Sequence, residues 1–267
     1  NLHSMTLETI SSRFFEKTQD TLIYFQTWIV ITDAMNVNAT VSPLPTVLKS
    51  DLEISIIIPV NNEADNIPIV ASELTRAMNC YRRWECIWID DGSSDQSSAI
   101  LEEIVVSDKC HRLVKFEGNS GKAAAYWEGF RQARGMLIAT MDGDGQNDPT
   151  DISRLAKIVL SGAADMGNGF RIAITGNSVR DVGCATRVFK RECVEYLPRF
   201  SGLHRFLATL VAMNGFRVVD IPVNHRPRLY GVTKYGIGNR LWVGLLDTIG
   251  VWWLQKRSIS YKIMISE

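Results

Sequence analysis

The residues best suited to bind a metal ion lie in one short turn. The apolar run Met136–Met141 is followed by Asp142-Gly143-Asp144, and Gln146 comes two residues later. If the run is a strand, both carboxylates lie at the carboxyl edge of a sheet, where a divalent cation bridging a nucleotide diphosphate would bind. An Asp-x-Asp pair is more often a solvated turn. Here the preceding strand and the proline-containing helix start at 148–151 favour a metal site.

Two other predicted strand ends carry acidic and amide side chains. The first apolar run ends in Pro59-Val60-Asn61-Asn62-Glu63, and the second ends in Asp90-Asp91. Carboxylates and amides there can accept hydrogen bonds from a base and from ribose hydroxyls. Capping of the next helix is the alternative, and it is as plausible as ligand binding for Asp95. Two adjacent acids rarely cap one helix, so Asp90 and Asp91 favour a ligand.

A glycine-rich turn, Gly118–Gly121, follows the third apolar run and leads through Lys122 into an alanine-rich segment. Backbone N–H groups at a helix start favour an anion, and the lysine adds positive charge. The spacing excludes a P-loop, which requires GxxxxGK[ST]. An alternative of equal weight is a helix start packed close to the sheet, with an incidental lysine.

These segments belong to a regular alternation of short apolar runs and helical stretches. The runs lie at Ile54–Val60, 85–90, 112–116 and 136–142, and the helices that follow end near Cys80 or span about 95–106, 122–133 and 151–161. Near-continuous apolar strands that alternate with helices predict an α/β fold, with a mostly parallel sheet flanked by helices. Ligands bind beyond the carboxyl ends of the strands in such folds.

The length of 267 residues suits one domain with appendages better than two equal domains. We expect an N-terminal appendage and linker at 1–50, the α/β domain at 51–235 and a C-terminal helix at 236–267. Lysine plus arginine and aspartate plus glutamate number 29 each, which argues against a nucleic-acid partner. The five cysteines lack a metal-like spacing, so a reducing cytosol without disulfides or zinc is favoured.

Contact with a membrane is expected at the C-terminal helix. The apolar runs Thr21–Thr32 and Leu241–Leu254 are too short to span a bilayer, and no signal peptide is evident, so a soluble or peripheral location is expected. The second run contains tryptophans and is followed by Lys256-Arg257, a pattern that suits a membrane interface. Ordinary core packing of this helix is nearly as plausible.

The segments PVNNE, IDDGSSD, GNSGKAAA and MDGDGQNDP, in this order and spacing, resemble the motifs of family-two glycosyltransferases of the GT-A fold, which is Rossmann-like. Within that family the chain is most similar to dolichyl- and undecaprenyl-phosphate sugar transferases, the dolichol-phosphate mannose synthase group. The resemblance extends from about Ile54 to Arg257. The residues it implies are Pro59, Glu63, Asp90 and Asp91 at the nucleoside, and Asp142, Gly143, Asp144 and Gln146 at the diphosphate and its Mg²⁺ or Mn²⁺ ion.

Segments of the second half resemble the acceptor side of this group. Arg187 ends the segment DVGCATR, whose arginine approaches the lipid phosphate in relatives, and Arg171 stands where relatives carry an arginine after the fifth strand. Arg228 and Lys234 belong to an R-x-x-G-x-[ST]-K loop. Guanidinium forks and a lysine suit two phosphate groups that must be brought together against their mutual repulsion.

The chain departs from the family pattern in two places. Asn61 stands where the family usually has an aromatic residue against the nucleotide, which leaves the base open. Only six residues separate Arg171 from Ser178, where the family usually has a longer amphipathic segment. Either this loop is short or the sequence lacks residues there, and the second explanation is favoured. For Arg180 and Arg226 a simple surface salt bridge is the favoured interpretation.

The function predicted from these features is transfer of a hexose, mannose first, from a GDP- or UDP-sugar to a polyprenyl phosphate, with inversion, at the cytoplasmic face of a membrane. Expected catalytic residues are Asp144, Arg187, Arg228 and Lys234. A phosphate acceptor, with a second pKa of about 6, needs no strong base. His204 is the only histidine worth testing as a base, and a structural role is favoured. The alternatives are a hydroxyl-directed transferase with a carboxylate base, and a sugar-nucleotide-binding subunit without turnover, which the intact acids disfavour.

Overall fold

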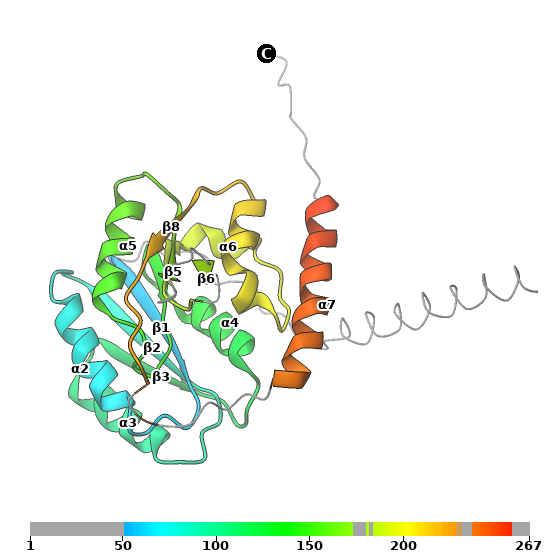
Figure 1. Cartoon of the computed structure of the whole chain (residues 1–267). Coiled ribbons are helices and arrows are strands. Elements are labelled where there is room, and N and C mark those ends of the chain that lie inside the picture. Colours follow the sequence, from blue (N-terminus) through cyan, green and yellow to red (C-terminus); the bar gives the residue numbers. More distant parts are fainter. Residues whose placement is uncertain (1–50, 173–179, 182–183, 229, 231–236, 258–267) are drawn as a thin grey trace, which may run out of the picture. The chain divides into compact units, whose positions relative to one another are not determined.

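The computed structural model describes residues 51–172, 180–181, 184–228, 230 and 237–257 (Figure 1). The predicted appendage at 1–50 and the predicted site residue Lys234 lie outside these ranges. Within them the chain forms a mixed α/β structure whose sheet is mostly parallel and flanked by helices, which confirms the predicted fold class.

The first half alternates strand and helix, as the apolar runs predict. Its elements are β1 (Ile54–Val60), α2 (Ile67–Met78), β2 (Trp84–Asp90), α3 (Ser97–Ser107), β3 (His111–Lys115), α4 (Lys122–Gln132), β4 (Leu137–Thr140) and α5 (Thr150–Leu160). Each lies within one or two residues of its predicted bounds.

The second half adds strands that extend the sheet, a 3₁₀ helix and two further α-helices. Its elements are β5 (Met166–Ile172), β6 (Arg180–Asp181), β7 (Arg187–Lys190), the 3₁₀ helix η1 (Arg191–Tyr196), α6 (Leu203–Met213), β8 (Val218–Pro222) and α7 (Ile237–Lys256). The C-terminal helix expected from the sequence is therefore present as α7.

The sheet has the order β3-β2-β1-β4-β7-β5-β6, with β8 paired to β5. Strands β3, β2, β1 and β4 are parallel, whereas β7 is antiparallel to both β4 and β5. The chain runs outward from β1 through β2 to β3 and returns to β4 on the other side of β1. The carboxyl ends of β1, β2 and β4 therefore meet at a topological switch point, where ligands bind in open α/β sheets.

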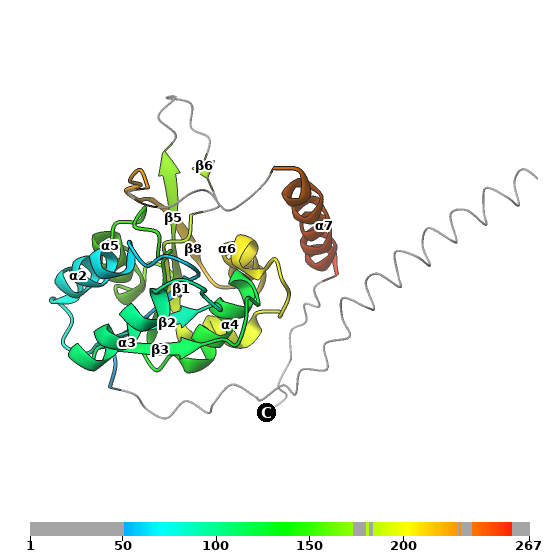
Figure 2. The ribbon, with the colours of Figure 1, turned by 90° about the horizontal axis from the view of Figure 1, so that it is seen from below.

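Both faces of the central strands are buried, which explains their near-continuous apolar sequences. On one face Ile56 and Trp88 pack with residues of α2, α3 and α5. On the other face Ile57 and Ile87 pack with residues of α4 and α6. Figure 2 shows α2 and α5 on one side of the sheet and α4 and α6 on the other. The two hydrophobic layers hold the strand ends in a fixed register.

Helix α7 exposes several large apolar side chains. The exposed ones are Leu245, Leu246, Ile249, Trp252, Trp253 and Leu254. An ion pair joins the helix to α6, since Arg205 Nη1 lies 2.9 Å from Asp247 Oδ2. Among the helices in the described part of the chain, none combines the length and apolarity needed to cross a bilayer.

Candidate active site

The turn after β4 folds back on itself and lies against the end of β1. The Asp142 N–H donates to Asn147 Oδ1 at 3.0 Å, and the Gln146 N–H donates to Asp144 Oδ1 at 3.1 Å. A Cβ atom at Gly143 would lie 2.6 Å from Val60 Cγ1, so a larger residue does not fit. Glycine at this position lets the turn approach β1 closely.

Each carboxylate of this turn pairs with a cation from a different part of the chain. Lys122 Nζ, at the start of α4, lies 2.5 Å from Asp142 Oδ1, and Arg228 Nη2 lies 2.7 Å from Asp144 Oδ2. The other terminal nitrogen of Arg228, Nη1, lies 3.8 Å from Glu63 Oε1. Charge-assisted contacts of this kind are the stronger hydrogen bonds in proteins. Lys122 therefore contacts a predicted metal ligand, and its role toward a bound anion stays a prediction.

Asp142 is ionised at neutral pH. Burial alone would raise its pKa, but the positive charges of Lys122 and Arg187 outweigh burial, so the pKa lies below its ordinary value. The side chains of Asp142 and Asp144 are 30% and 12% exposed, so Asp142 in particular stays open to a ligand. The turn thus carries two negative charges, each balanced by a nearby cation.

Arg187 is more deeply buried than expected for a residue that contacts a lipid phosphate. It is 2% exposed and pairs with Thr140 in the β4–β7 register. Its Nε donates to Asn168 Oδ1 at 3.0 Å, and its Nη1 donates to the His204 carbonyl at 3.1 Å. Direct contact with an acceptor phosphate therefore stays a prediction. The structure supports one nearby effect, the lowering of the Asp142 pKa.

Asp91 makes contacts that the sequence did not predict. Its carboxylate accepts hydrogen bonds from the Ser120 N–H at 2.7 Å and from the Gly121 N–H at 3.0 Å. The sequence left these N–H groups open between an anion site and a plain helix start, and in this structure both donate to Asp91. Asp90 accepts from the Ser93 N–H at 2.9 Å, and both acids are buried. The pair fixes the turn that leads to Lys122, and its role at a nucleoside stays a prediction.

Asp95 and Asn62 connect the loops after β1 and β2. Asp95 accepts from the N–H groups of Ser97, at 2.9 Å, and Ala64, at 3.2 Å. Asn62 has a φ of 54° and accepts from the Ser94 N–H at 2.7 Å. Asp95 thus accepts from the first N–H of α3, whose N-cap residue is Gln96, and it joins the two loops. A role for Asp95 at a ligand stays a prediction.

The remaining predicted nucleoside residues lie at the same sheet edge. Pro59 is opposite Ile89 in the β1–β2 register. Glu63 accepts from Asn66 Nδ2 at 2.7 Å and lies near Arg228. Arg171 is in β5, where its backbone pairs with Asp181 of β6. The structure therefore gathers Glu63, Asp144 and Arg228 but leaves the side-chain role of Arg171 a prediction.

Gln146 contacts the segment after β8. Its Nε2 donates to the Arg226 carbonyl at 3.4 Å and lies 3.4 Å from His225 Nε2. The Arg226 side chain makes the salt bridges expected from the sequence, to Glu73 at 2.7 Å and Asp148 at 3.0 Å. The sequence offered no sign that both acids share this one guanidinium, because they lie far from Arg226 along the chain.

The predicted metal ligands fit a hard cation in their chemistry. Asp142, Asp144 and Gln146 offer carboxylate and amide oxygens, the donors that Mg²⁺ and Mn²⁺ prefer. No group of three or more His, Cys, Asp or Glu side chains in the described residues is arranged to hold a metal. In this structure Lys122 and Arg228 supply positive charge at the two acids instead.

His204 is poorly suited to act as a general base. Burial and the positive charges of Lys122 and Arg205 lower the pKa of His204 to about 3. A general base works best when its pKa lies near the operating pH. Its Nδ1 is buried and has no hydrogen-bond partner among the described residues. The imidazole is thus neutral at physiological pH, which agrees with the structural role favoured from the sequence.

Residues 55–214 match the model of the family described as "Glycosyl transferase family 2". A dodecaprenyl-phosphate galacturonate synthase of Rhizobium johnstonii is 32% identical, over 75% of this chain and 66% of the relative. An undecaprenyl-phosphate 4-deoxy-4-formamido-L-arabinose transferase of Yersinia enterocolitica is 31% identical, over 69% of this chain and 63% of the relative. The chain thus spans slightly less than two thirds of these relatives.

Solved structures share the fold at low sequence identity. Glucosyl-3-phosphoglycerate synthase from Mycobacterium tuberculosis, in complex with Mn²⁺, UDP and phosphoglyceric acid, has a TM-score of 0.59 at 16% identity, covering 79% of this chain and 80% of that one. S. aureus TarS 1–349 in complex with UDP-GlcNAc has a TM-score of 0.57 at 15% identity, covering 76% and 67%. At these identities the likeness concerns the fold alone.

Proposed function

Because the chain belongs to glycosyl transferase family 2, we propose that it transfers a sugar from a nucleoside diphosphate to a polyprenyl phosphate. The observation that carries the proposal is the pairing of Asp142 with Lys122 and of Asp144 with Arg228 at the switch point of the sheet. Relatives whose names specify dodecaprenyl and undecaprenyl phosphate support the acceptor class.

In the proposed reaction a phosphate oxygen of the acceptor attacks C1 of the sugar in line. The bond from C1 to the diphosphate oxygen breaks, the electron pair leaves with the nucleoside diphosphate, and the configuration at C1 inverts. Asp142, Asp144 and Gln146 would hold the Mg²⁺ or Mn²⁺ ion, which would neutralise charge on the leaving diphosphate. Lys122 and Arg228 bring further positive charge to the same place.

No protein base is required in this mechanism. A phosphate monoester with a second pKa of about 6 is largely ionised at neutral pH. The low pKa of His204 therefore agrees with a phosphate acceptor. A hydroxyl acceptor would instead require a positioned carboxylate, and the acids at this edge are engaged with cations or backbone N–H groups.

The identity of the donor's sugar and of its nucleoside base has less support than the acceptor class. The relatives carry galacturonate and 4-deoxy-4-formamido-L-arabinose in their names, and the structural neighbours were solved with UDP or UDP-GlcNAc. The names of the relatives include no nucleotide, so both GDP- and UDP-sugars are kept as donors in the proposal. The hexose, with mannose first, remains a prediction that none of these names supports.

A donor and acceptor panel tests the proposal. The protein is incubated with Mn²⁺, undecaprenyl or citronellyl phosphate and radiolabelled donors that include GDP-mannose, UDP-glucose and UDP-galacturonate, and label extracted into organic solvent is counted. We expect one donor to label the polyprenyl phosphate. Labelling of a hydroxyl acceptor instead would replace this proposal with the second transferase class. Donor binding without any transfer would favour the non-catalytic subunit.

We expect Asp91→Ala to weaken donor binding about fivefold when no acceptor is present. The substitution removes the two hydrogen bonds from the Ser120 and Gly121 N–H groups, which together contribute ~1 kcal/mol net. Without them the segment that leads to Lys122 is held less firmly. Glu63→Ala should weaken donor binding as well, since Glu63 lies at the adjacent strand end. Isothermal titration calorimetry provides the measurement.

Glu102→Ala serves as the control for both variants, because Glu102 is an exposed acid whose ion pair in the described structure is with Lys115, on β3. Its donor affinity should equal that of the wild type. If Glu63→Ala and Asp91→Ala also bind the donor with unchanged affinity, the nucleoside site lies elsewhere.

We further propose that the protein contacts the cytoplasmic face of a membrane through α7. The exposed apolar side chains of this helix and the exposed Lys256 and Arg257 at its end suit an anionic interface. All five cysteines are unpaired, in keeping with a reducing compartment. The family's lipid acceptor would be reached there.

Replacing Trp252 and Trp253 with alanine should lower binding to phosphatidylglycerol-containing vesicles about tenfold, because each tryptophan offers an amphipathic ring to the interface. Vesicle flotation measures the bound fraction. Tyr196→Ser, which removes an exposed aromatic residue from η1, should leave binding unchanged. Equal flotation of the tryptophan variant and the wild type would argue against contact through α7.

A further inference from the structure

The segment after β8 runs along the candidate active site and is held at successive residues. The Val223 N–H donates to the Phe170 carbonyl at 3.0 Å, and the Asn224 N–H donates to Asp151 Oδ2 at 2.7 Å. Next, the Arg226 N–H donates to the Gln146 carbonyl at 2.8 Å. Two residues later Arg228 reaches Asp144 and Glu63. We name residues 223–228 the β8 segment.

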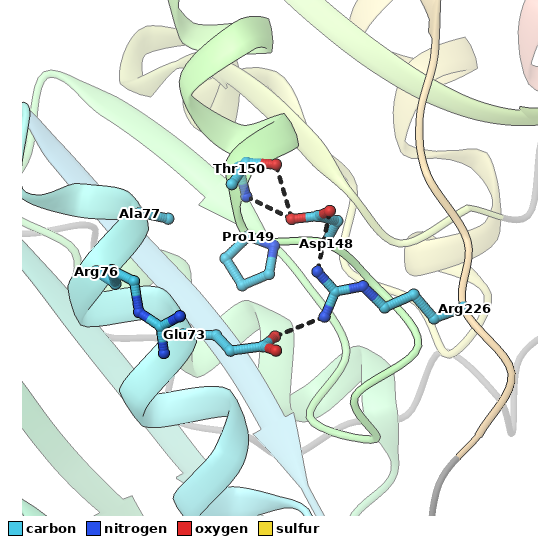
Figure 3. A pocket seen from close by; sticks show the side chains of 7 residues that line it. All are labelled: Glu73, Arg76, Ala77, Asp148, Pro149, Thr150 and Arg226. Carbon is cyan, nitrogen blue, oxygen red and sulfur yellow. Dashed lines mark hydrogen bonds and ion pairs between the residues drawn. The ribbon is translucent and has the colours of Figure 1, made fainter.

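The Arg226 side chain joins two other elements. Its Nη1 lies 2.7 Å from Glu73 Oε2 on α2, and its Nη2 lies 3.0 Å from Asp148 Oδ2, before α5. Figure 3 shows the guanidinium between these two carboxylates, at a pocket that Arg76 and Pro149 also line. The Arg226 side chain is only 39% exposed. A bidentate arginine at partly buried acids is fixed in direction as well as position.

Asp148 is itself fixed. Its Oδ1 accepts from the Thr150 N–H at 3.0 Å and from the Thr150 hydroxyl at 2.7 Å, at the start of α5 (Figure 3). Glu73 lies within α2, which packs against the sheet. Both carboxylates that contact Arg226 therefore belong to rigid parts of the fold. Because Arg226 binds both of them, it holds the β8 segment in place against α2 and the start of α5.

We propose that Arg226 is a positioning residue of the transferase, one that holds the β8 segment so that Arg228 meets Asp144 and Glu63. This inference rests on the proposed function. Within the described residues the Arg226 side chain pairs with Glu73 and Asp148 and not with Asp142 or Asp144, and its main chain exchanges hydrogen bonds with Gln146. We therefore expect Arg226 to act through Arg228 and Gln146. Lysine cannot replace it fully, because an ammonium has no planar fork to bridge two carboxylates.

A double-mutant cycle on transfer activity tests this dependence. We expect Arg226→Gln to lower kcat/KM about fivefold to tenfold in the wild-type background and less than about twofold in the Arg228→Gln background, because coupled residues are non-additive. Arg226→Lys should recover part of the activity. Arg83→Gln is the matched control. Arg83 precedes β2 and pairs with Asp51 at the amino ends of the strands, opposite to the carboxyl ends that form the site. Its kcat/KM should equal that of the wild type.

Hydrogen exchange provides a readout that needs no activity. In Arg226→Gln, peptides covering 222–230 should exchange faster, while peptides of β1 and β2 remain as protected as in the wild type and in Arg83→Gln. Absence of transfer by the wild-type protein would overturn the proposed function, and the exchange result would still decide whether Arg226 holds the β8 segment. Equal losses from Arg226→Gln in both backgrounds, or unchanged exchange at 222–230, would overturn the positioning role.

Discussion

Asp144→Asn should abolish transfer while leaving the fold intact. The substitution removes a charged ligand from the proposed cation and the negative charge that Arg228 contacts. Loss of such transition-state stabilisation costs on the order of 3 kcal/mol, which corresponds to a hundredfold or larger loss in kcat. Initial rates at saturating donor measure the effect, and circular dichroism verifies the fold.

Asp65→Asn is the control for Asp144→Asn, because Asp65 is an exposed acid in the loop after β1. It should keep wild-type activity. Removal of divalent ions from the wild-type protein with EDTA should produce a loss of similar size, with recovery on addition of Mn²⁺. Near-normal rates in EDTA would remove the cation from the mechanism.

Neutralising Arg187 should reduce use of the acceptor much more than donor binding. If its charge attracts the acceptor phosphate, losing a charge-assisted contact worth about 1.5–3 kcal/mol lowers kcat/KM for citronellyl phosphate tenfold or more in Arg187→Gln. Arg187→Lys keeps the charge and should lose less. Acceptor titrations measure kcat/KM, and calorimetry measures donor affinity.

Because Arg187 is buried and donates to Asn168 and the His204 carbonyl, its replacement also threatens stability. Thermal unfolding must therefore accompany the kinetics, with Arg131→Gln on α4 as the control for loss of a partly exposed arginine. A folded Arg187→Gln protein with normal acceptor kinetics would assign Arg187 a structural role. Equal loss of donor and acceptor binding would contradict a role specific to the acceptor.

The fold was predictable because burial on both faces leaves a clear pattern. Strands β1 and β2 read as continuous apolar runs since neither face meets water, and the polar residues that follow them mark the sheet edge. Asp142 and Asp144 were placed at this edge for the same reason. No such pattern marks Asn168, a polar residue within β5 that binds Arg187.

The pairings within the site were less predictable, because they join residues far apart along the chain. Arg228 reaches Asp144 across 84 positions, and Arg226 reaches Glu73 across 153. The sequence identified Asp91 as a site acid but could not show that its carboxylate faces the N–H groups of Ser120 and Gly121. Spacing predicts which residues share an edge of the sheet, whereas tertiary packing decides which donor each one meets.

Strand β7 lies between β4 and β5, and its two ladders fix the position of Arg187. Arg187 is located by its ladder with Thr140 and Asn168, and a slip of one residue would turn its side chain to the opposite face. That ladder does not depend on how many residues connect β5 to β7. A change in the length of that connection is therefore expected to leave Arg187 and the turn at 142–146 in place.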